Sequence, residues 1–306
     1  MSKVSDFEHV VKQSEDNFRL DKLLVMLNEG HSRHQIQLWI KDGNVVVNGK
    51  KVKPNYKCKQ DDVIMWHIAE KKPITIDAEP IALSIIYEDE SVIVLNKPKG
   101  MLVHPTQTVQ SGTLVNALKY HSPQLSTVSG AERPGIVHRL DQFTSGIMVV
   151  CKDDMTHEHL KRQFQQKAVT RMYEAIVYGT IAHDKGVIKA PIGRDPNNRL
   201  RMGVVSNGKE AETRFRVLGR SNDYTHVQCQ LITGRTHQIR VHMKYLSHPI
   251  VGDTVYSRKK TKDIEEQALF ARTLGFIHPK TEAYVEFSVA QPTEFVNLLN
   301  LYRFNS

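Results

Sequence analysis

The chain has 306 residues, with 42 Lys or Arg against 33 Asp or Glu, so its formal net charge is +9. This length allows one large core with a smaller satellite domain, or two medium domains. The positive charge suits a polyanionic partner, because each neutralised phosphate releases counterions. The three cysteines, Cys58, Cys151 and Cys229, form no CxxC pair, which argues against a zinc site and against a disulfide framework.

Two observations bear on location. No apolar run approaches the roughly 18 residues that a membrane span needs. The first residues, MSKVSDFEHVV, lack the apolar core of a signal peptide. We therefore expect a soluble cytoplasmic protein with no membrane partner, and we take a monomer as the default oligomeric state.

The first 84 residues predict a small helix-hairpin module. Residues 1–17 are polar and are expected to form an N-terminal arm, either as a short edge strand or mobile. Apolar residues recur at helical spacing from Leu20 to Leu27, and Ser32 is placed to cap a second helix that ends by Gly43. Asn48-Gly49 between apolar flanks predicts a two-residue hairpin. The module spans residues 18–70, and residues 71–84, with Lys and Pro, are the expected linker.

The polar face of this module is basic. A charge run is most often an ordinary solvated surface. However, RLDKLL followed by SRHQIQLWIKDGNVVVNGKKVKPNYKCKQDDVI resembles the S-four-type RNA-binding domain first seen in a small-subunit ribosomal protein. Such domains contact structured RNA mainly through its phosphates and shape. The resemblance implies RNA contacts by Arg33, Lys41, Lys51 and Lys53.

Residues 85–306 predict a second, larger domain. Strand patterns flank the turn at 88–90 and recur at 169–179, and helical patterns cover 111–120, 155–167 and 293–302. We expect an α+β fold, with a catalytic domain whose sheet is mixed and mainly antiparallel.

Residues 138–152, HRLDQFTSGIMVVCK, place a charged cluster directly before an apolar strand. An aspartate on a turn before a core strand is held rigidly and is partly desolvated. Asp141 is therefore a candidate nucleophile, base or metal ligand. An aspartate near Gly and Ser also commonly caps a turn, in which case Asp141 would only pair with Arg139. The residues alone leave these alternatives open.

Two further segments contain candidate residues. Tyr173 lies in the strand at 169–179, where a tyrosine most often packs half-buried. In LITGRTHQIRVHM, residues 231–243, the apolar side chains can pack while Arg235 and Arg240 face elsewhere. His237 and His242 are five residues apart, which is poor spacing for a helical metal pair, so we predict no metal site.

Three dispersed motifs together resemble the RluA family of RNA pseudouridine synthases. They are HRLD with TSG and the strand that follows, the strand containing Arg171, Tyr173, Ala175 and Gly179, and GRTHQIRVH. The resemblance covers nearly the whole chain in the family's order, which is more specific than any single match. The chain departs from the family pattern at Gln142, Phe143, Phe270 and Glu282, where the family commonly has Lys, an acidic residue, His and Gly.

This resemblance implies isomerisation of uridine to pseudouridine in RNA, without a cofactor. Asp141 matches the catalytic carboxylate, Arg240 matches the arginine paired with it, and Tyr173 would stack on the uracil and relay or accept a proton. His138 and Arg139 would hold the RNA while the base is extruded. Arg235 is a further predicted RNA contact. Ribosomal RNA, of the large subunit, is the first expected substrate and transfer RNA the second.

Two other functions are open to the sequence. The chain could be an RNA-binding assembly factor without turnover, which a test for pseudouridine would distinguish. It could also be a metal-dependent RNA hydrolase. That activity needs clustered carboxylates, and besides Asp141 only Asp153 and Asp154 lie near the central motif.

Overall fold

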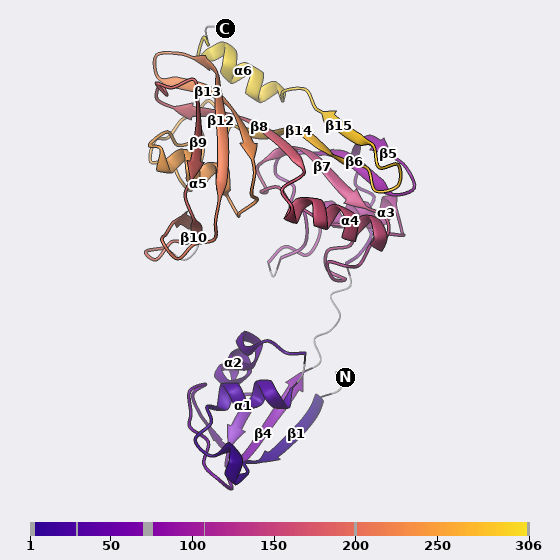
Figure 1. The fold of residues 1–306 in the computed structure, drawn as a ribbon, viewed down its shortest axis with the longest axis vertical. Coiled ribbons are helices and arrows are strands. Elements are labelled where there is room, and N and C mark those ends of the chain that lie inside the picture. The colour runs from indigo at the N-terminus through magenta and orange to yellow at the C-terminus, as the bar shows by residue number, and fades with distance from the viewer. Residues whose placement is uncertain (1–3, 29, 70–75, 107, 199–200, 305–306) are drawn as a thin grey trace. The chain divides into compact units, whose positions relative to one another are not determined.

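The structure is a computed structural model that describes residues 4–28, 30–69, 76–106, 108–198 and 201–304. The chain divides into two compact units, residues 1–74 and residues 75–306. Figure 1 shows the first unit in indigo and violet and the second from magenta to yellow.

The first unit packs two helices, α1 (Leu20–Leu27) and α2 (Arg33–Asp42), with a four-stranded sheet. The strand order is β1-β4-β2-β3, from β1 (Val4–Val10), β2 (Val45–Val47), β3 (Lys50–Lys51) and β4 (Val63–Ala69), and a 3-10 turn, η1 (Gln13–Glu15), follows β1. Both predicted helices and the predicted hairpin are confirmed. Because β1 pairs antiparallel with β4 at the edge of the sheet, residues 4–10 of the predicted arm take the edge-strand form of the two forms expected.

Local sequence signals explain these elements. The Ser32 hydroxyl accepts a hydrogen bond from the Gln35 N–H, and the Gln35 side chain accepts one from the Ser32 N–H, which together form a capping box. At the hairpin, Asn48 and Gly49 have φ values of 50° and 73°, as a two-residue turn of this hand requires. The Asn48 side chain also accepts the Val63 N–H at 2.8 Å, which ties the turn to β4.

The second unit is built on a nine-stranded sheet in the order β5-β6-β7-β14-β8-β13-β12-β9, with β15 paired to β14. Among the pairings within the described residues, β7 with β14 is parallel and the others in this sheet are antiparallel. The predicted α+β class with a mixed, mainly antiparallel sheet is therefore confirmed. Its strands are β5 (Ser84–Glu88), β6 (Val92–Lys97), β7 (Ser145–Cys151), β8 (Thr170–Tyr178), β9 (Lys185–Lys189), β12 (Glu212–Arg220), β13 (Tyr224–Leu231), β14 (Leu269–Ile277) and β15 (Tyr284–Ser288).

Among the described residues, four helices and a small two-stranded ribbon complete this unit. They are α3 (Leu114–His121), α4 (Asp154–Gln165), α5 (Gln238–Tyr245), α6 (Thr293–Leu301) and the pair β10 (Ile192–Arg194) with β11 (Met202–Val204). Helix α4 contacts β7 and β14, whereas α5 contacts β11 and β12 at the other end of the sheet (Figure 1). None of the helices in the described part of the chain is long and apolar enough to cross a membrane.

The second unit starts at residue 75, whereas the sequence analysis assigned residues 71–84 to a linker and started the catalytic domain at 85. Residues 71–75 lie outside the described part of the chain. From Ile76 onward the segment packs on α3: Ile76 is buried in the core, and its carbonyl accepts a hydrogen bond from Lys119 at 2.7 Å. The Asn116 side chain donates to the Asp77 carbonyl at 2.9 Å. The described part of the predicted linker therefore belongs to the second unit.

Two departures from the family pattern lie at structural positions. Phe270, in β14, is buried in the core of the second unit and packs against Phe295 of α6. Glu282 has a φ of 57° in the turn between β14 and β15, a conformation that glycine adopts more readily. Both residues serve packing or turn geometry.

Candidate active site

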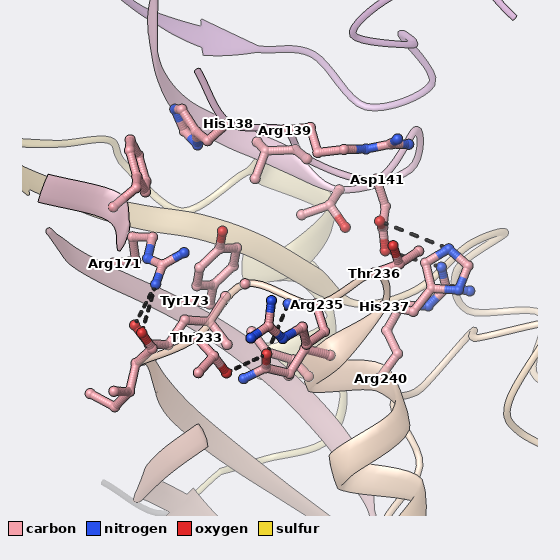
Figure 2. A pocket seen from close by; sticks show the side chains of 18 of the residues that line it. His138, Arg139, Asp141, Arg171, Tyr173, Thr233, Arg235, Thr236, His237 and Arg240 are labelled. Atoms are coloured by element: carbon pink, nitrogen blue, oxygen red, sulfur yellow. Dashed lines mark hydrogen bonds and ion pairs between the residues drawn. The ribbon is translucent and has the colours of Figure 1, made fainter. Parts of the chain in front are cut away.

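A cavity of about 600 Å³ opens in the second unit, between the turn before β7, strand β8 and the loop that enters α5 (Figure 2). Its volume lies in the range of ligand-binding pockets. All of the catalytic candidates and three of the predicted RNA contacts line it: Asp141, Tyr173, Arg240, His138, Arg139 and Arg235. The other predicted RNA contacts, Arg33, Lys41, Lys51 and Lys53, lie in the first unit.

Asp141 lies on a turn that is fixed at several points. The Thr144 N–H donates to the Asp141 carbonyl at 3.1 Å, which closes the turn. The next carbonyl, that of Gln142, accepts hydrogen bonds from the Gly100 N–H and from the Lys97 ammonium, each at 3.0 Å. This arrangement holds the turn in place and leaves the Asp141 side chain, 19% exposed, directed into the pocket.

The glycine of the TSG motif is required by the contact between β7 and β14. Gly146 has a φ of 121°, and a Cβ at this position would lie 2.2 Å from the carbonyl oxygen of Ala271. A larger residue would push the parallel pair apart and displace the turn that carries Asp141.

Arg240 links Asp141 to a second, fully buried carboxylate. Its guanidinium donates to both oxygens of Asp253, at 2.7 and 3.0 Å, and to Asp141 Oδ2 at 3.2 Å. Burial alone would lower the pKa of Arg240, but the hydrogen bonds and charge of Asp253, with Asp141, raise it above its ordinary value. Arg240 is therefore a permanent cation held beside Asp141. The sequence predicted the pairing of Asp141 with Arg240 but not the role of Asp253.

Tyr173 occupies the middle of the pocket in Figure 2, with Arg171 on one side and Asp141 on the other. It projects from β8 and is 8% exposed. Burial raises the pKa of Tyr173 to about 12, although Arg171 acts to lower it. The phenol is therefore neutral across the physiological range, and its ring presents a flat surface in the pocket.

The wall opposite the Asp141 turn is a loop held by buried polar side chains. Arg171 donates to the carbonyls of Leu231 and Ile232, at 3.2 and 3.1 Å. The Gln238 side chain, at the start of α5, accepts the Thr233 hydroxyl at 2.7 Å and the Arg235 N–H at 2.9 Å. Neither Arg171 nor Gln238 was predicted as a pocket residue, although both lie within the motifs that were singled out.

His138 has a structural contact that the sequence analysis did not anticipate. Its Nε2 accepts the Val149 N–H at 3.0 Å, and its ring stacks on Phe164 at 5.0 Å between centroids. Burial, with a smaller effect of Arg171, lowers the pKa of His138 to about 3. A neutral ring whose Nε2 acceptor is already used holds the segment before Asp141 against β7, and the ring also lines the pocket, where the RNA contact expected from the motif stays a prediction.

This geometry predicts a pH-dependent stability. The unfolded chain protonates His138 near pH 6.5, whereas the folded chain does so only near pH 3, so the unfolded state binds more protons between these values. Stability is therefore lost as the pH falls through that window. In urea unfolding, the wild type should lose about 2 kcal/mol more between pH 7 and pH 5 than His138→Gln, whose side-chain oxygen can still accept from Val149. Equal losses in the two proteins would contradict this role.

Lys97 is another pocket-supporting residue for which the sequence alone predicted no role. It is fully buried at the end of β6, and its ammonium donates to the carbonyls of Pro98, Met101 and Gln142, at 2.8, 2.8 and 3.0 Å. These three bonds join the turn after β6 to the turn that carries Asp141.

Replacing Lys97 by Met should remove all three bonds while keeping most of the side-chain volume. Because buried carbonyls then lose their donors, we expect the unfolding free energy to fall by about 2–4 kcal/mol. Product formation should also fall in the folded protein, since the Asp141 turn is less well held. Lys119→Met, which removes one bond to the Ile76 carbonyl, is the matched control and should reduce stability less and leave turnover unchanged.

In the first unit, Arg33 is partly committed to the fold. It donates to the fully buried carboxylate of Asp21 at 2.7 Å, and Arg19 and Gln37 also donate to this carboxylate. Burial opposes ionisation of Asp21, but these donors hold its pKa well below the ordinary value. Lys41, Lys51 and Lys53 are exposed. The three lysines are therefore more available to a partner than Arg33, whose side chain is 48% exposed.

Comparisons with known proteins agree with this geometry. Residues 91–245 match the family model described as RNA pseudouridylate synthase, and residues 18–64 match that of the S4 domain. The chain is 48% identical to the Bacillus subtilis (strain 168) protein named "Uncharacterized RNA pseudouridine synthase YlyB", over 99% of this chain and all of that protein. It is 42% identical to the "Ribosomal large subunit pseudouridine synthase D" of Neisseria meningitidis (serogroup A), over 93% of this chain and 79% of that one.

Among solved structures, Human RNA Pseudouridylate Synthase Domain Containing 1 is similar, with a TM-score of 0.58 and 26% identity, covering 71% of this chain and 87% of that one. Fold and site thus define an RNA-modifying isomerase. The chain belongs to the RNA pseudouridylate synthase family, in its RluA branch, and has an S4 domain ahead of the catalytic unit. The family predicted from the motifs is confirmed.

Proposed function

We propose that this enzyme converts specific uridines of large-subunit ribosomal RNA to pseudouridine. The substrate is inferred from relatives at 42% and 41% identity whose names specify the large ribosomal subunit. A net charge of +9 and exposed lysines in the S4 domain suit a structured, polyanionic substrate. Transfer RNA is the second candidate substrate. We also propose that the enzyme acts as a monomer in the cytoplasm.

We assign Asp141 as the catalytic carboxylate, and the observation that carries the assignment is its position. A partly buried carboxylate, paired with a permanently charged Arg240, faces the same cavity as the ring of Tyr173. Isomerisation requires the uracil to leave its ribose, rotate, and reattach through carbon 5, with loss of the carbon-5 proton. A carboxylate beside base and sugar supports the first and last steps, and a flat phenol can stack on the free base during rotation.

The remaining residues have supporting roles in this proposal. Arg240 pairs with the Asp141 carboxylate and orients it toward the substrate. Arg139, which is exposed at the rim of the pocket, and Arg235 bind the RNA near the extruded base. Lys41, Lys51 and Lys53, with Arg33, contact RNA phosphates in the S4 domain. No metal or cofactor takes part in this proposal, and added chelator should leave turnover unchanged.

Pseudouridine mapping tests the proposal in cells. Total RNA from cells with and without the gene is labelled with carbodiimide and analysed by primer extension. We expect one or a few sites in large-subunit ribosomal RNA to disappear with the gene and to return when the wild-type gene is restored. Loss of sites in transfer RNA alone would replace the proposed substrate. Loss of no site, with purified protein that binds RNA but makes no product, would favour an assembly factor.

A further inference from the structure

His237 also lines the pocket, and the roles assigned above do not explain its geometry. It precedes α5 and has a φ of 57°, a left-handed conformation that is uncommon for a residue other than glycine. Its Nε2 lies 3.9 Å from Asp141 Oδ1, and its side chain is 24% exposed. Figure 2 shows the ring directed at the Asp141 carboxylate from the α5 side of the pocket. An unusual backbone held at a catalytic pocket indicates a functional constraint.

The hydrogen bonds around Tyr256 favour one tautomer of His237. The Tyr256 oxygen accepts the Met202 N–H at 3.0 Å and lies 2.8 Å from His237 Nδ1. Because this oxygen already accepts one hydrogen bond, its own proton is the one placed to donate to Nδ1, and we take Nδ1 as the acceptor. The proton of the neutral ring is then on Nε2, and it points toward Asp141.

The ring is neutral at physiological pH. Burial lowers the pKa of His237, while Asp141 opposes this shift and Arg240 adds to it. The separation of 3.9 Å between Nε2 and Oδ1 is too long for a direct hydrogen bond. The donor and the acceptor both line the cavity, and an oxygen atom about 2.8 Å from each would lie to the side of the line that joins them.

The hydrogen-bonding properties of His237 and Asp141 determine which substrate group can contact both of them. An atom between an N–H donor and a carboxylate must both accept and donate a hydrogen bond. The uracil carbonyls and the phosphates only accept, and they would be repelled by Asp141, while the uracil N3–H only donates. Within an RNA chain the 3′ and 5′ oxygens of a nucleotide are esterified, so the ribose 2′-hydroxyl is the group of the target uridine that does both.

We infer that His237 donates a hydrogen bond from Nε2 to the ribose 2′-hydroxyl of the target uridine, which in turn donates to Asp141. His237 is thus a specificity residue that favours ribose over deoxyribose at the modified position. Tyr256 is a positioning residue, because it fixes the tautomer of His237. The inference rests on the proposed role of Asp141.

The test compares two synthetic RNA fragments that contain a mapped target uridine, one all-ribose and one with 2′-deoxyuridine at that single position. Single-turnover rates are measured for the wild type and for His237→Phe, which keeps the ring but has no donor. We expect the wild type to convert the ribose substrate about tenfold faster, the size expected for one buried hydrogen bond. The variant should convert the two substrates at rates within about twofold of each other. A structural defect would slow both reactions and leave their ratio unchanged.

Two further variants keep the test decisive. His237→Gln, whose amide N–H can reach the position of Nε2, should retain the ribose preference, and Thr236→Ala, the exposed neighbour in the same loop, should not change it. If His237→Phe does not fold, Tyr256→Phe takes its place and should reduce the preference, because the tautomer is no longer fixed.

The inference is overturned if the wild type converts both substrates equally, or if folded His237→Phe keeps the wild-type preference. A wild-type protein that converts neither RNA would instead count against the proposed function itself.

Discussion

Asp141→Asn should reduce pseudouridine formation by at least about 10³-fold while RNA affinity stays nearly unchanged. Asparagine has the same shape and can still contact Arg240, so the pocket should keep its form. It cannot act as a base or a nucleophile in the way that a carboxylate does. The large loss should therefore appear in single-turnover rates, and binding of the ribosomal RNA fragment, followed by filter retention, should change little.

Asp184→Asn is the matched control for this substitution. Asp184 lies on the same unit, is 85% exposed and pairs with Arg220 at the surface, so the charge change is the same but lies outside the pocket. Its rate should equal that of the wild type. Turnover by Asp141→Asn within about tenfold of the wild type would remove Asp141 from the chemistry.

Arg240→Ala should have the largest effect on stability among the substitutions considered. Arg240 is 6% exposed, and its removal leaves the fully buried Asp253 carboxylate without its cation. Breaking a buried pair in this way typically costs about 3–5 kcal/mol, because one charge remains buried and uncompensated. The free energy of unfolding in urea measures the loss. Product formation, assayed at a temperature at which the variant remains folded, should also be lost, since Asp141 loses its partner.

Arg214→Ala provides the comparison for Arg240→Ala. Arg214 pairs with Glu212 at 2.9 Å, but its own side chain is 54% exposed, so the pair is worth at most about 1 kcal/mol. A loss of similar size in the two variants would mean that the Arg240 network contributes no more than a surface ion pair.

The elements that were predicted correctly have local causes. The capping box at Ser32, the Asn48-Gly49 hairpin and the apolar strand β7 are each specified by residues within a few positions of one another. Helix α5 was not predicted, because its buried face contains Gln238, Arg240 and His242. Their polar side chains are buried through hydrogen bonds to distant partners, and they interrupt the apolar periodicity by which a helix is identified.

The site residues likewise divide into those that a sequence motif indicated and those that only the folded structure brings to the site. The motif match paired Asp141 with Arg240 across 99 residues of sequence, which no local pattern could have done. The contacts of Lys97 with Gln142 and of His138 with Val149 depend on strand pairing, so the residue types alone did not indicate them. Asp253 lies in the segment HPIVGDTVY, residues 248–256, for which the sequence alone predicted no role. Its partner becomes evident only when α5 brings Arg240 against it.

The most direct test of the central claim is release of tritium from large-subunit ribosomal RNA labelled at carbon 5 of uridine, because reattachment through carbon 5 expels that hydrogen. RNA from cells that lack the gene is incubated with purified wild-type protein or with Asp141→Asn. We predict release in proportion to the number of mapped sites with the wild type, in the presence of chelator and without added cofactor, and none with the variant. Equal release by both proteins, or none by the wild type on any cellular RNA, would contradict the account.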